Sequence, residues 1–227
     1  MKVLCTNALK TVVSALAPEF ERARGSKLDL IWGSTQMLVD RIGAGEGGDL
    51  AILSEEAIDD LIRQGSLAPG SRTDLGRSFI GIAVRQGATK PDIGTVDAFT
   101  AALLAAPSIT YSKTGISGIY FRGLLERLGL ADAMRAKTVL PAPGLSVGEA
   151  LATGEAAIGV QQISELMPVP GLEIVGPLPP PLQKVSVLSA GLFAHAADAA
   201  GARALAEALT APAARVVYQR NGLEPVA

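Results

Sequence analysis

Residues 111–121, YSKTGISGIYF, form the stretch that decides how this chain folds. The β-branched pair Ile109 and Thr110 precedes it, serine, threonine and glycine fill its turn, and apolar residues at helical spacing follow it. This pattern predicts a strand, a small-residue turn and a helix start. The first N–H groups of such a helix have no partner within it, so they can bind an anion. The same residues also suit an ordinary capped helix with glycine turns, and both interpretations stay open.

Three similar units precede this stretch. Apolar runs at residues 2–6, 28–32 and 49–53 predict strands, and apolar residues at helical spacing follow each run. Three strand–helix units in succession favour a parallel sheet with helices on its faces. Ligands of such sheets bind at the carboxyl ends of the strands.

The second half of the chain restarts the α/β pattern, which predicts a second lobe inserted into the first. Ser146 and Glu149 have the spacing of a capping box, which opens another helix. We expect lobe 1 to comprise residues 1–78 and 191–227, and lobe 2 to comprise residues 79–190. Further strands are predicted at 79–84, 137–140, 157–160, 172–175 and 184–193, and further helices at 95–106, 199–209 and 212–219.

Composition excludes several classes of protein. The net charge is −2, no basic run is present, and nine aromatic residues are scattered along the chain, so we expect no nucleic-acid partner. Cys5 is the only cysteine and His195 the only histidine, which excludes an internal disulfide and a Cys/His metal set. No apolar stretch approaches the roughly 18 residues of a membrane span. We therefore expect no metal, no cofactor and no insertion into a membrane.

The order of the elements and several motifs resemble the type II periplasmic solute-binding proteins of ABC transporters, and within them the molybdate-binding-protein-like group. The resemblance covers essentially the whole chain. It implies an α/β fold of two lobes, each a central, mostly parallel sheet flanked by helices, with crossing strands near residues 78–83 and 185–191. It also implies a ligand cleft between lobes that close on the ligand. The motifs that carry it are NALK (7–10), GST (33–35), GDLAI (48–52), GISGIYF (115–121), AAIGVQQISEL (156–166) and VGPLPPPLQ (175–183).

The sequence departs from the molybdate-binding pattern in ways that concern the ligand. Molybdate binders typically place a serine in the first turn, where this chain has Ala8, whereas Ser34 and Thr35 match the paired hydroxyls of the second turn. Those sites hold a tetrahedral oxyanion with neutral donors. Here Arg77 lies at the first lobe crossing and Lys113 in the turn at 111–121, and cationic donors suit carboxylates. We therefore favour a small organic acid over an oxyanion.

Each candidate residue also has a purely structural interpretation. Asn7 is either an amide donor to the ligand or a cap of the first helix, and Ser117 can serve as donor and as cap. Arg77 and Lys113 are either ligand contacts or solvated charges. Gln161 and Gln162 end an apolar strand, where one amide is expected to reach the ligand. The candidate ligand-binding residues are Asn7, Ala8, Ser34, Thr35, Arg77, Lys113, Ser117, Gln161 and Gln162.

Three other polar or reactive residues are assigned no binding role. Asp49 opens the third strand at the end remote from the expected cleft, so we interpret it as structural. Cys5 has no neighbouring base in the sequence to activate it, which favours a buried, inert thiol. His195 is expected at the surface.

The leading interpretation is a monomeric binding protein for a small anion, with an ABC-transporter permease as a further partner. One alternative is a cofactor-independent isomerase of a small unsaturated polycarboxylate, since relatives of this group include such an enzyme, with Glu165 or Lys113 as the base. Another is an intracellular small-molecule sensor. We expect a cytoplasmic location if Met1 is the native start, and a periplasmic one if a signal peptide has been removed.

Overall fold

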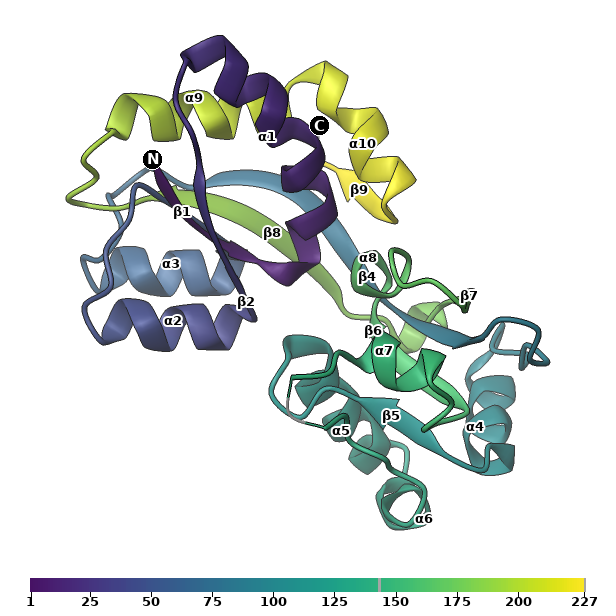
Figure 1. Cartoon of the computed structure of the whole chain (residues 1–227). Helices are drawn as coiled ribbons and strands as arrows, with labels where there is room; N and C mark the ends of the chain where they lie inside the picture. The colour runs from purple at the N-terminus through teal and green to yellow at the C-terminus, as the bar shows by residue number, and fades with distance from the viewer. Residues whose placement is uncertain (143, 227) are drawn as a thin grey trace. The chain divides into compact units, whose positions relative to one another are not determined.

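The computed structural model describes residues 1–142 and 144–226, which form two compact units (Figure 1). Unit 1 comprises Met1–Ser78 and Ser186–Ala227, and unit 2 comprises Phe79–Val185. The chain passes into unit 2 within strand β4 (Thr73–Arg85) and back into unit 1 at the start of strand β8 (Val185–Leu192). Nearly all of β8 therefore belongs to unit 1, whereas the sequence placed the return at residue 191.

The sheet of unit 1 has the strand order β2-β1-β3-β8-β4, and β9 pairs with β4. Strand β1 (Lys2–Thr6) is parallel to β2 (Asp29–Gly33) and to β3 (Leu50–Ser54). Strand β8 runs antiparallel to β3, and β9 (Leu223–Pro225) runs antiparallel to β4. The carboxyl ends of β1, β2 and β3 consequently lie at one edge of this sheet.

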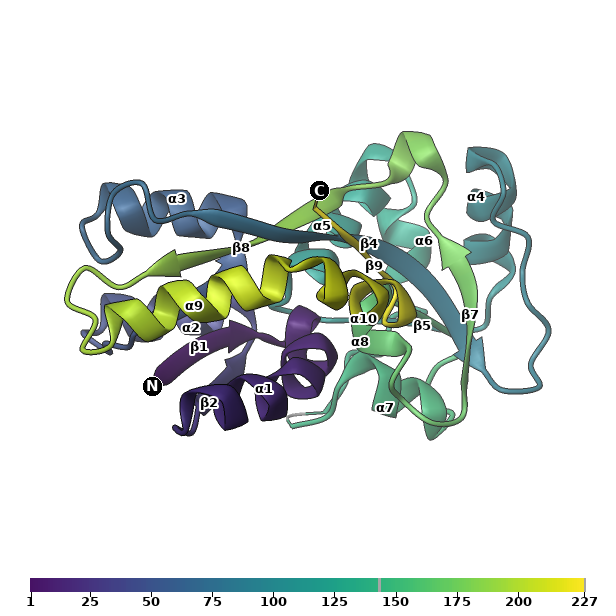
Figure 2. The ribbon, with the colours of Figure 1, turned by 90° about the horizontal axis from the view of Figure 1, so that it is seen from above.

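Helices cover both faces of the unit 1 sheet because side chains alternate along its strands. Val3 and Cys5 face a core shared with three helices, of which α1 packs beside α9 and α10 (Figures 1 and 2). Leu4 and Leu53 face a second core, shared with two other helices. The first group is α1 (Lys10–Arg24), α9 (Ala199–Thr210) and α10 (Arg215–Arg220), with the 3-10 turns η1 (Asn7–Leu9) and η3 (Pro212–Ala214), and the second is α2 (Thr35–Gly43) and α3 (Glu55–Arg63).

Unit 2 is built on the second half of β4. Strand β6 (Ile158–Gln162) pairs antiparallel with β4 and parallel with β5 (Ile109–Tyr111), and β7 (Leu172–Pro177) pairs antiparallel with β4. Ile80 and Ile82 face the core beneath α4 and α5, whereas Ala83 packs with α7 and α8. The remaining elements of the unit are α4 (Val96–Ala105), α5 (Ile116–Arg127), α6 (Ala131–Arg135), α7 (Val147–Ala152), α8 (Ile163–Leu166) and the 3-10 turn η2 (Pro180–Leu182).

Most elements agree with the sequence, and the exceptions have physical reasons. The capping box of Ser146 and Glu149 is confirmed at the start of α7. The predicted strand at 137–140 is wrong, because only Thr138 bridges to Ile109 at the margin of the sheet. Strand β4 begins at Thr73 rather than at 79, and β9 was not predicted. No helix in the described ranges is long and apolar enough to cross a membrane.

Candidate functional site

Three helix starts gather at one edge of the unit 1 sheet. Strands β2, β1 and β3 are neighbours and parallel, and each is followed directly by a helical turn: α2 at Thr35, η1 at Asn7 and α3 at Glu55. Free N–H groups and the positive end of the peptide dipoles lie at such starts. This edge is therefore the part of unit 1 best suited to an anion.

The starts of α2 and η1 differ from that of α3 in charge. Neither α2 nor η1 has an acidic residue in its first turn, whereas Glu55 and Glu56 lie in the first turn of α3. Carboxylates at a helix start compensate its partial positive charge and repel a second anion. An anion is consequently expected at the ends of β1 and β2 rather than at the end of β3.

Ser34 and Thr35 lie where the sequence placed them, between β2 and α2. Ser34 caps the helix, because its Oγ accepts a hydrogen bond of 3.2 Å from the Met37 N–H. A hydroxyl that accepts one bond can still donate its own hydrogen, so this cap remains a donor for a ligand. Thr35 is buried in the first turn of α2.

The turn after β1 contradicts one expectation. Neither Thr6 nor Asn7 caps the first long helix, because the 3-10 turn η1 intervenes and α1 begins only at Lys10, with Leu9 as its N-cap. The Thr6 side chain makes no capping bond at η1 either. Asn7 is exposed and Ala8 is buried. The Asn7 amide is thus not used as a cap and is free to contact solvent or a ligand.

The turn at 111–121 forms the strand–turn–helix predicted for it, with a different cap. Gly115 is the N-cap of α5, and the Ser112 Oγ accepts a hydrogen bond of 2.8 Å from the Gly115 N–H. Ser117 is the second residue of α5 and is buried in the first turn, so its predicted role as a cap is wrong. Lys113 is exposed in the turn. The role of Ser112 as the acceptor of this bond was not predicted, although serine is a usual turn residue.

A glycine is required inside the same turn. A Cβ atom on Gly118 would lie 1.7 Å from the carbonyl oxygen of Ser112, far closer than a carbon and an oxygen atom can approach without a covalent bond. Gly118 therefore allows the backbone of α5 to pack directly on the turn that precedes it. This contact fixes the position of the α5 start relative to β5.

Buried polar groups gather at the end of β6. The Gln161 Nε2 donates a hydrogen bond of 2.8 Å to the Glu165 Oε2. Among the described residues, the buried Gln161 Oε1 and Ser164 Oγ have no hydrogen-bond partner. Gln162 is buried beside them. Ser164 was missed, since its position in the short helix α8 gives no sequence signal of burial.

Glu165 is the one carboxyl of this cluster, and its pKa is unusual. Burial disfavours the charged form and raises the pKa of Glu165 to about 7, although the bond from Gln161 acts in the opposite direction. This carboxyl can therefore gain and lose a proton near neutral pH. Such a group can serve as a general base or as a neutral hydrogen-bond donor.

Arg77 lies elsewhere than the sequence suggested. It is an exposed residue inside β4, opposite Glu224 of β9, rather than a turn residue that precedes a strand. In the part of the chain that the structure describes, its guanidinium forms no ion pair. Its contact with a ligand stays a prediction.

The three residues without an assigned binding role lie as expected. The Asp49 carboxylate accepts bonds of 2.8 Å from the N–H groups of Lys2 and Asp198, and these bonds outweigh burial, so the pKa of Asp49 is lowered. Cys5 is fully buried, and burial raises the pKa of its thiol. His195 is exposed. Within residues 1–142 and 144–226, no group of three His, Cys, Asp or Glu residues could hold a metal ion.

The structure thus places seven of the nine candidate residues in two sets, one in each unit, and the cations Arg77 and Lys113 belong to neither set. Asn7, Ala8, Ser34 and Thr35 share the edge where β1 and β2 end. Ser117, Gln161 and Gln162 follow or end the parallel neighbours β5 and β6. Both sets consist of neutral donors and helix starts.

Comparison with known proteins agrees with this architecture. The chain belongs to the bacterial extracellular solute-binding protein family, whose sequence model matches residues 1–224. It is 38% identical to an aconitate isomerase of a Pseudomonas species over 232 aligned residues, which cover 100% of this chain and 88% of that protein.

Solved structures of other binding proteins share its fold. The periplasmic molybdate-binding protein of Azotobacter vinelandii is similar with a TM-score of 0.79 and 21% identity, covering 100% of this chain and 99% of the other. The sulfate-binding protein SubI of Mycobacterium tuberculosis is similar with a TM-score of 0.76 and 15% identity, covering 100% and 86%. The fold is thus the two-lobe type II fold. The resemblance to the bacterial solute-binding proteins is confirmed.

Proposed function

We propose that this solute-binding protein binds a small anion, and that the anion is an organic carboxylate rather than an inorganic oxyanion. The observation that carries the proposal is the edge of unit 1 where β1 and β2 end. Two helix starts without acidic residues meet there, beside the hydroxyls of Ser34 and Thr35. Backbone N–H groups and hydroxyls at such a place bind anions without a counter-charge.

Unit 2 supplies a second set of donors for the same ligand in this proposal. Ser117 lies in the first turn of α5, which also has no acidic residue in that turn, and Gln161 and Gln162 end β6. The expectation that two lobes close on the ligand stays a prediction. Small-angle X-ray scattering tests it, because closure would reduce the radius of gyration when ligand is added.

The preference for a carboxylate has two supports. Arg77 and Lys113 are exposed cations on the chain segments that the resemblance places near the ligand, and a guanidinium can bind a carboxylate through two hydrogen bonds. The relative at 38% identity is named for aconitate, a tricarboxylate. We also propose the partner and location usual for such a family, an ABC-transporter permease and the periplasm.

Calorimetric titration tests this function with molybdate, sulfate, citrate and the two isomers of aconitate. We expect a tricarboxylate to bind with the highest affinity, and Ser34→Ala with Thr35→Val to weaken its binding. Ser54→Ala is the matched control, because Ser54 caps α3 at the same edge, where Glu55 and Glu56 already compensate the helix start. Tighter binding of molybdate than of any carboxylate would contradict the preference.

A second candidate function is isomerisation of an unsaturated polycarboxylate. It is favoured by Glu165, whose pKa of about 7 suits a base that takes a proton from a C–H group at neutral pH. The base would remove a proton from a carbon next to the double bond, the double bond would shift by one position, and the proton would be returned to the carbon at the far end of the original double bond. Lys113, the other candidate base, is exposed and therefore lacks the burial that Glu165 has.

Proton NMR distinguishes catalysis from binding. The protein is incubated with one aconitate isomer, and the appearance of the other is followed. Conversion by the wild type that is lost in Glu165→Gln, with binding retained, would establish an enzyme. Binding without conversion by the wild type would support a binding function in transport and contradict catalysis.

A further inference from the structure

Unit 2 contains a pocket of about 580 Å³ at the end of its sheet opposite to Gln161 and Gln162. Its walls come from the end of β4, the last turn of α4 and the segments that lead into β5 and β6. Strand β6 runs from Ile158, at the pocket, to Gln162, so about 13 Å of extended chain separates the pocket from the candidate ligand residues of this unit. The pocket is therefore separate from the candidate site.

The walls of the pocket are mainly apolar and mostly made of small residues. Its volume is within the range of roughly 300–1,000 Å³ that is typical of small-molecule sites. Methyl groups and proline rings leave this space open, where larger side chains would fill it. The small residues of the apolar wall include Ala88, Pro91, Ala102, Ala105, Pro107 and Ala157, and the larger Val84 and Ile158 also line the pocket.

One cation lines the pocket. Arg85 is the exposed last residue of β4, and it forms no ion pair in the described part of the chain. Its guanidinium lies against Gly154, where a Cβ atom would be 2.8 Å from the Arg85 Nη1. The nearby carboxylate of Glu173 is already used, since it accepts from the Gly87 N–H at 3.0 Å and pairs with Lys90 at 3.1 Å. Arg85 is consequently available to an external anion.

Two further groups orient a ligand in this pocket. The Ser108 Oγ accepts a bond of 3.1 Å from the Ala157 N–H, which leaves the hydroxyl hydrogen free to donate. The carboxyl end of α4, at Ala105, carries a partial negative charge that repels an anion. A negative group is therefore favoured beside Arg85, and an uncharged group beside α4.

We propose that this pocket binds a small monocarboxylate with an apolar body. The carboxylate pairs with Arg85, and the body packs on the wall of alanine and proline side chains. Burial of an apolar body and a carboxylate–guanidinium pair are the two interactions that this combination of residues offers. The site is independent of the anion-binding function proposed above.

Amide NMR of ¹⁵N-labelled full-length protein tests the pocket, with phenylacetate as the probe and phenylacetamide as its uncharged counterpart. We expect phenylacetate to shift the amide signals of Ala88, Ser108 and Ala157, and phenylacetamide to bind at least about tenfold more weakly, since a hydrogen bond to a charged group is lost. Arg85→Gln should weaken phenylacetate to a similar degree, and Ala105→Trp should abolish its binding by filling the space.

The control is Arg122→Gln, which changes a guanidinium at another pocket of unit 2, of about 420 Å³. We expect it to leave the phenylacetate titration unchanged. The proposal is overturned if phenylacetate shifts no signals, if it shifts those of Ser34 or Gln161 instead, or if both Arg85→Gln and Ala105→Trp bind it like the wild type. Ala105→Trp keeps the test decisive if Arg85→Gln does not fold.

Discussion

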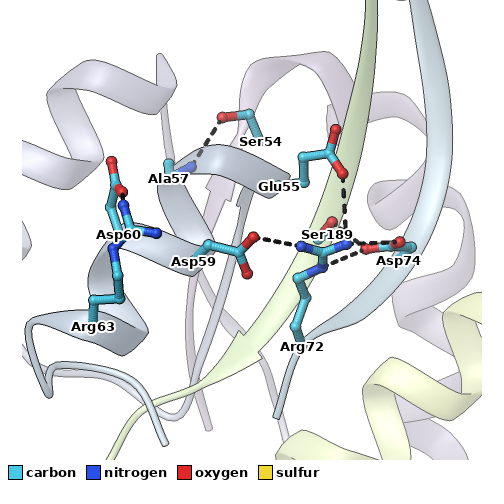
Figure 3. A network of polar contacts seen from close by, with 9 residues as sticks. All are labelled: Ser54, Glu55, Ala57, Asp59, Asp60, Arg63, Arg72, Asp74 and Ser189. Atoms are coloured by element: carbon cyan, nitrogen blue, oxygen red, sulfur yellow. Dashed lines mark hydrogen bonds and ion pairs between the residues drawn. The ribbon is translucent and has the colours of Figure 1, made fainter. Parts of the chain in front are cut away.

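The hydroxyl of Ser189, on β8, donates a hydrogen bond of 2.7 Å to the carboxylate of Asp74, on β4. Asp74 also accepts from the Arg72 Nε at 2.9 Å, and the same guanidinium contacts Asp59 at 2.6 Å and Glu55 at 3.5 Å (Figure 3). Arg72 thereby connects helix α3 to β4, and Ser189 connects β4 to β8. These are the two strands through which the chain leaves and re-enters unit 1.

The Arg72 network should stabilise unit 1 more than an isolated surface ion pair does. Arg72→Lys keeps the charge but cannot reach three carboxylates at once, so we expect the free energy of unfolding to fall by about 1 kcal/mol. Arg63→Lys is the matched control, because among the described residues Arg63 pairs only with the exposed Asp60 of the same helix (Figure 3). It should cost less than about 0.5 kcal/mol. Equal losses in urea unfolding would show that the network adds nothing to its single pairs.

The bond between Ser189 and Asp74 should make stability depend on pH. Partial burial would raise the pKa of Asp74, but the bonds from Arg72 and Ser189 outweigh it and lower the pKa below its ordinary 3.8. The stabilisation is therefore present above pH 4 and lost as the pH falls through the lower, folded-state pKa. Ser189→Ala should cost roughly 1.5–3 kcal/mol at pH 7, since Ser189 is fully buried, and less at pH 3.

Urea unfolding of Ser189→Ala and wild type at pH 7 and pH 3 measures this difference. Ser14→Ala, on the exposed side of α1, is the control and should change stability by less than about 0.5 kcal/mol at either pH. A loss for Ser189→Ala that is larger at pH 3 than at pH 7 would contradict a charged Asp74 as its partner.

Gly118 should not tolerate a side chain. In Gly118→Ala the new methyl group would meet the carbonyl oxygen of Ser112, so α5 would have to move, and we expect a loss of more than about 2 kcal/mol. Gly123→Ala lies on the same helix, where a Cβ meets only the end of Arg127 at 3.6 Å, and should stabilise by about 0.5–1 kcal/mol through helix propensity. Thermal unfolding of the two variants should give shifts of opposite sign.

The sequence predicted those features that depend on local pattern. The apolar runs located β1, β2 and β3 to within a residue, and the spacing of Ser146 and Glu149 located the start of α7. Ser34 and Thr35 were correctly placed after β2 for the same reason. Whether they bind a ligand stays a prediction.

Features that depend on distant partners were not predictable. The run at 137–140 has the composition of a strand, but it lies at a margin where Thr138 alone bridges to a neighbour. Asn7 does not cap the first long helix because a 3-10 turn separates β1 from α1, so of its two expected roles only that of ligand donor stays a prediction. The pKa of Glu165 depends on how much protein surrounds it, which no spacing of residues reveals.

Glu165 should make the two candidate functions respond to pH in opposite directions. If it only adjoins a bound anion, its protonation removes a negative charge, so anion affinity should rise as the pH falls from 8 to 6 through about 7. If it is the base, only the ionised form works, and isomerisation should become faster as the pH rises through the same value. Glu165→Gln should abolish either dependence.

Glu165→Gln should also be more stable than the wild type at pH 8. A carboxyl whose folded-state pKa is raised from 4.5 makes the folded protein less stable as the pH rises from about 4.5 through 7. All three effects are measured at pH 6, 7 and 8, by calorimetric affinities, NMR rates and urea unfolding. The control is Glu155→Gln, because Glu155 is an exposed glutamate of the same unit. If both Glu165→Gln and wild type show the same flat profiles in all three measurements, Glu165 has no part in either function.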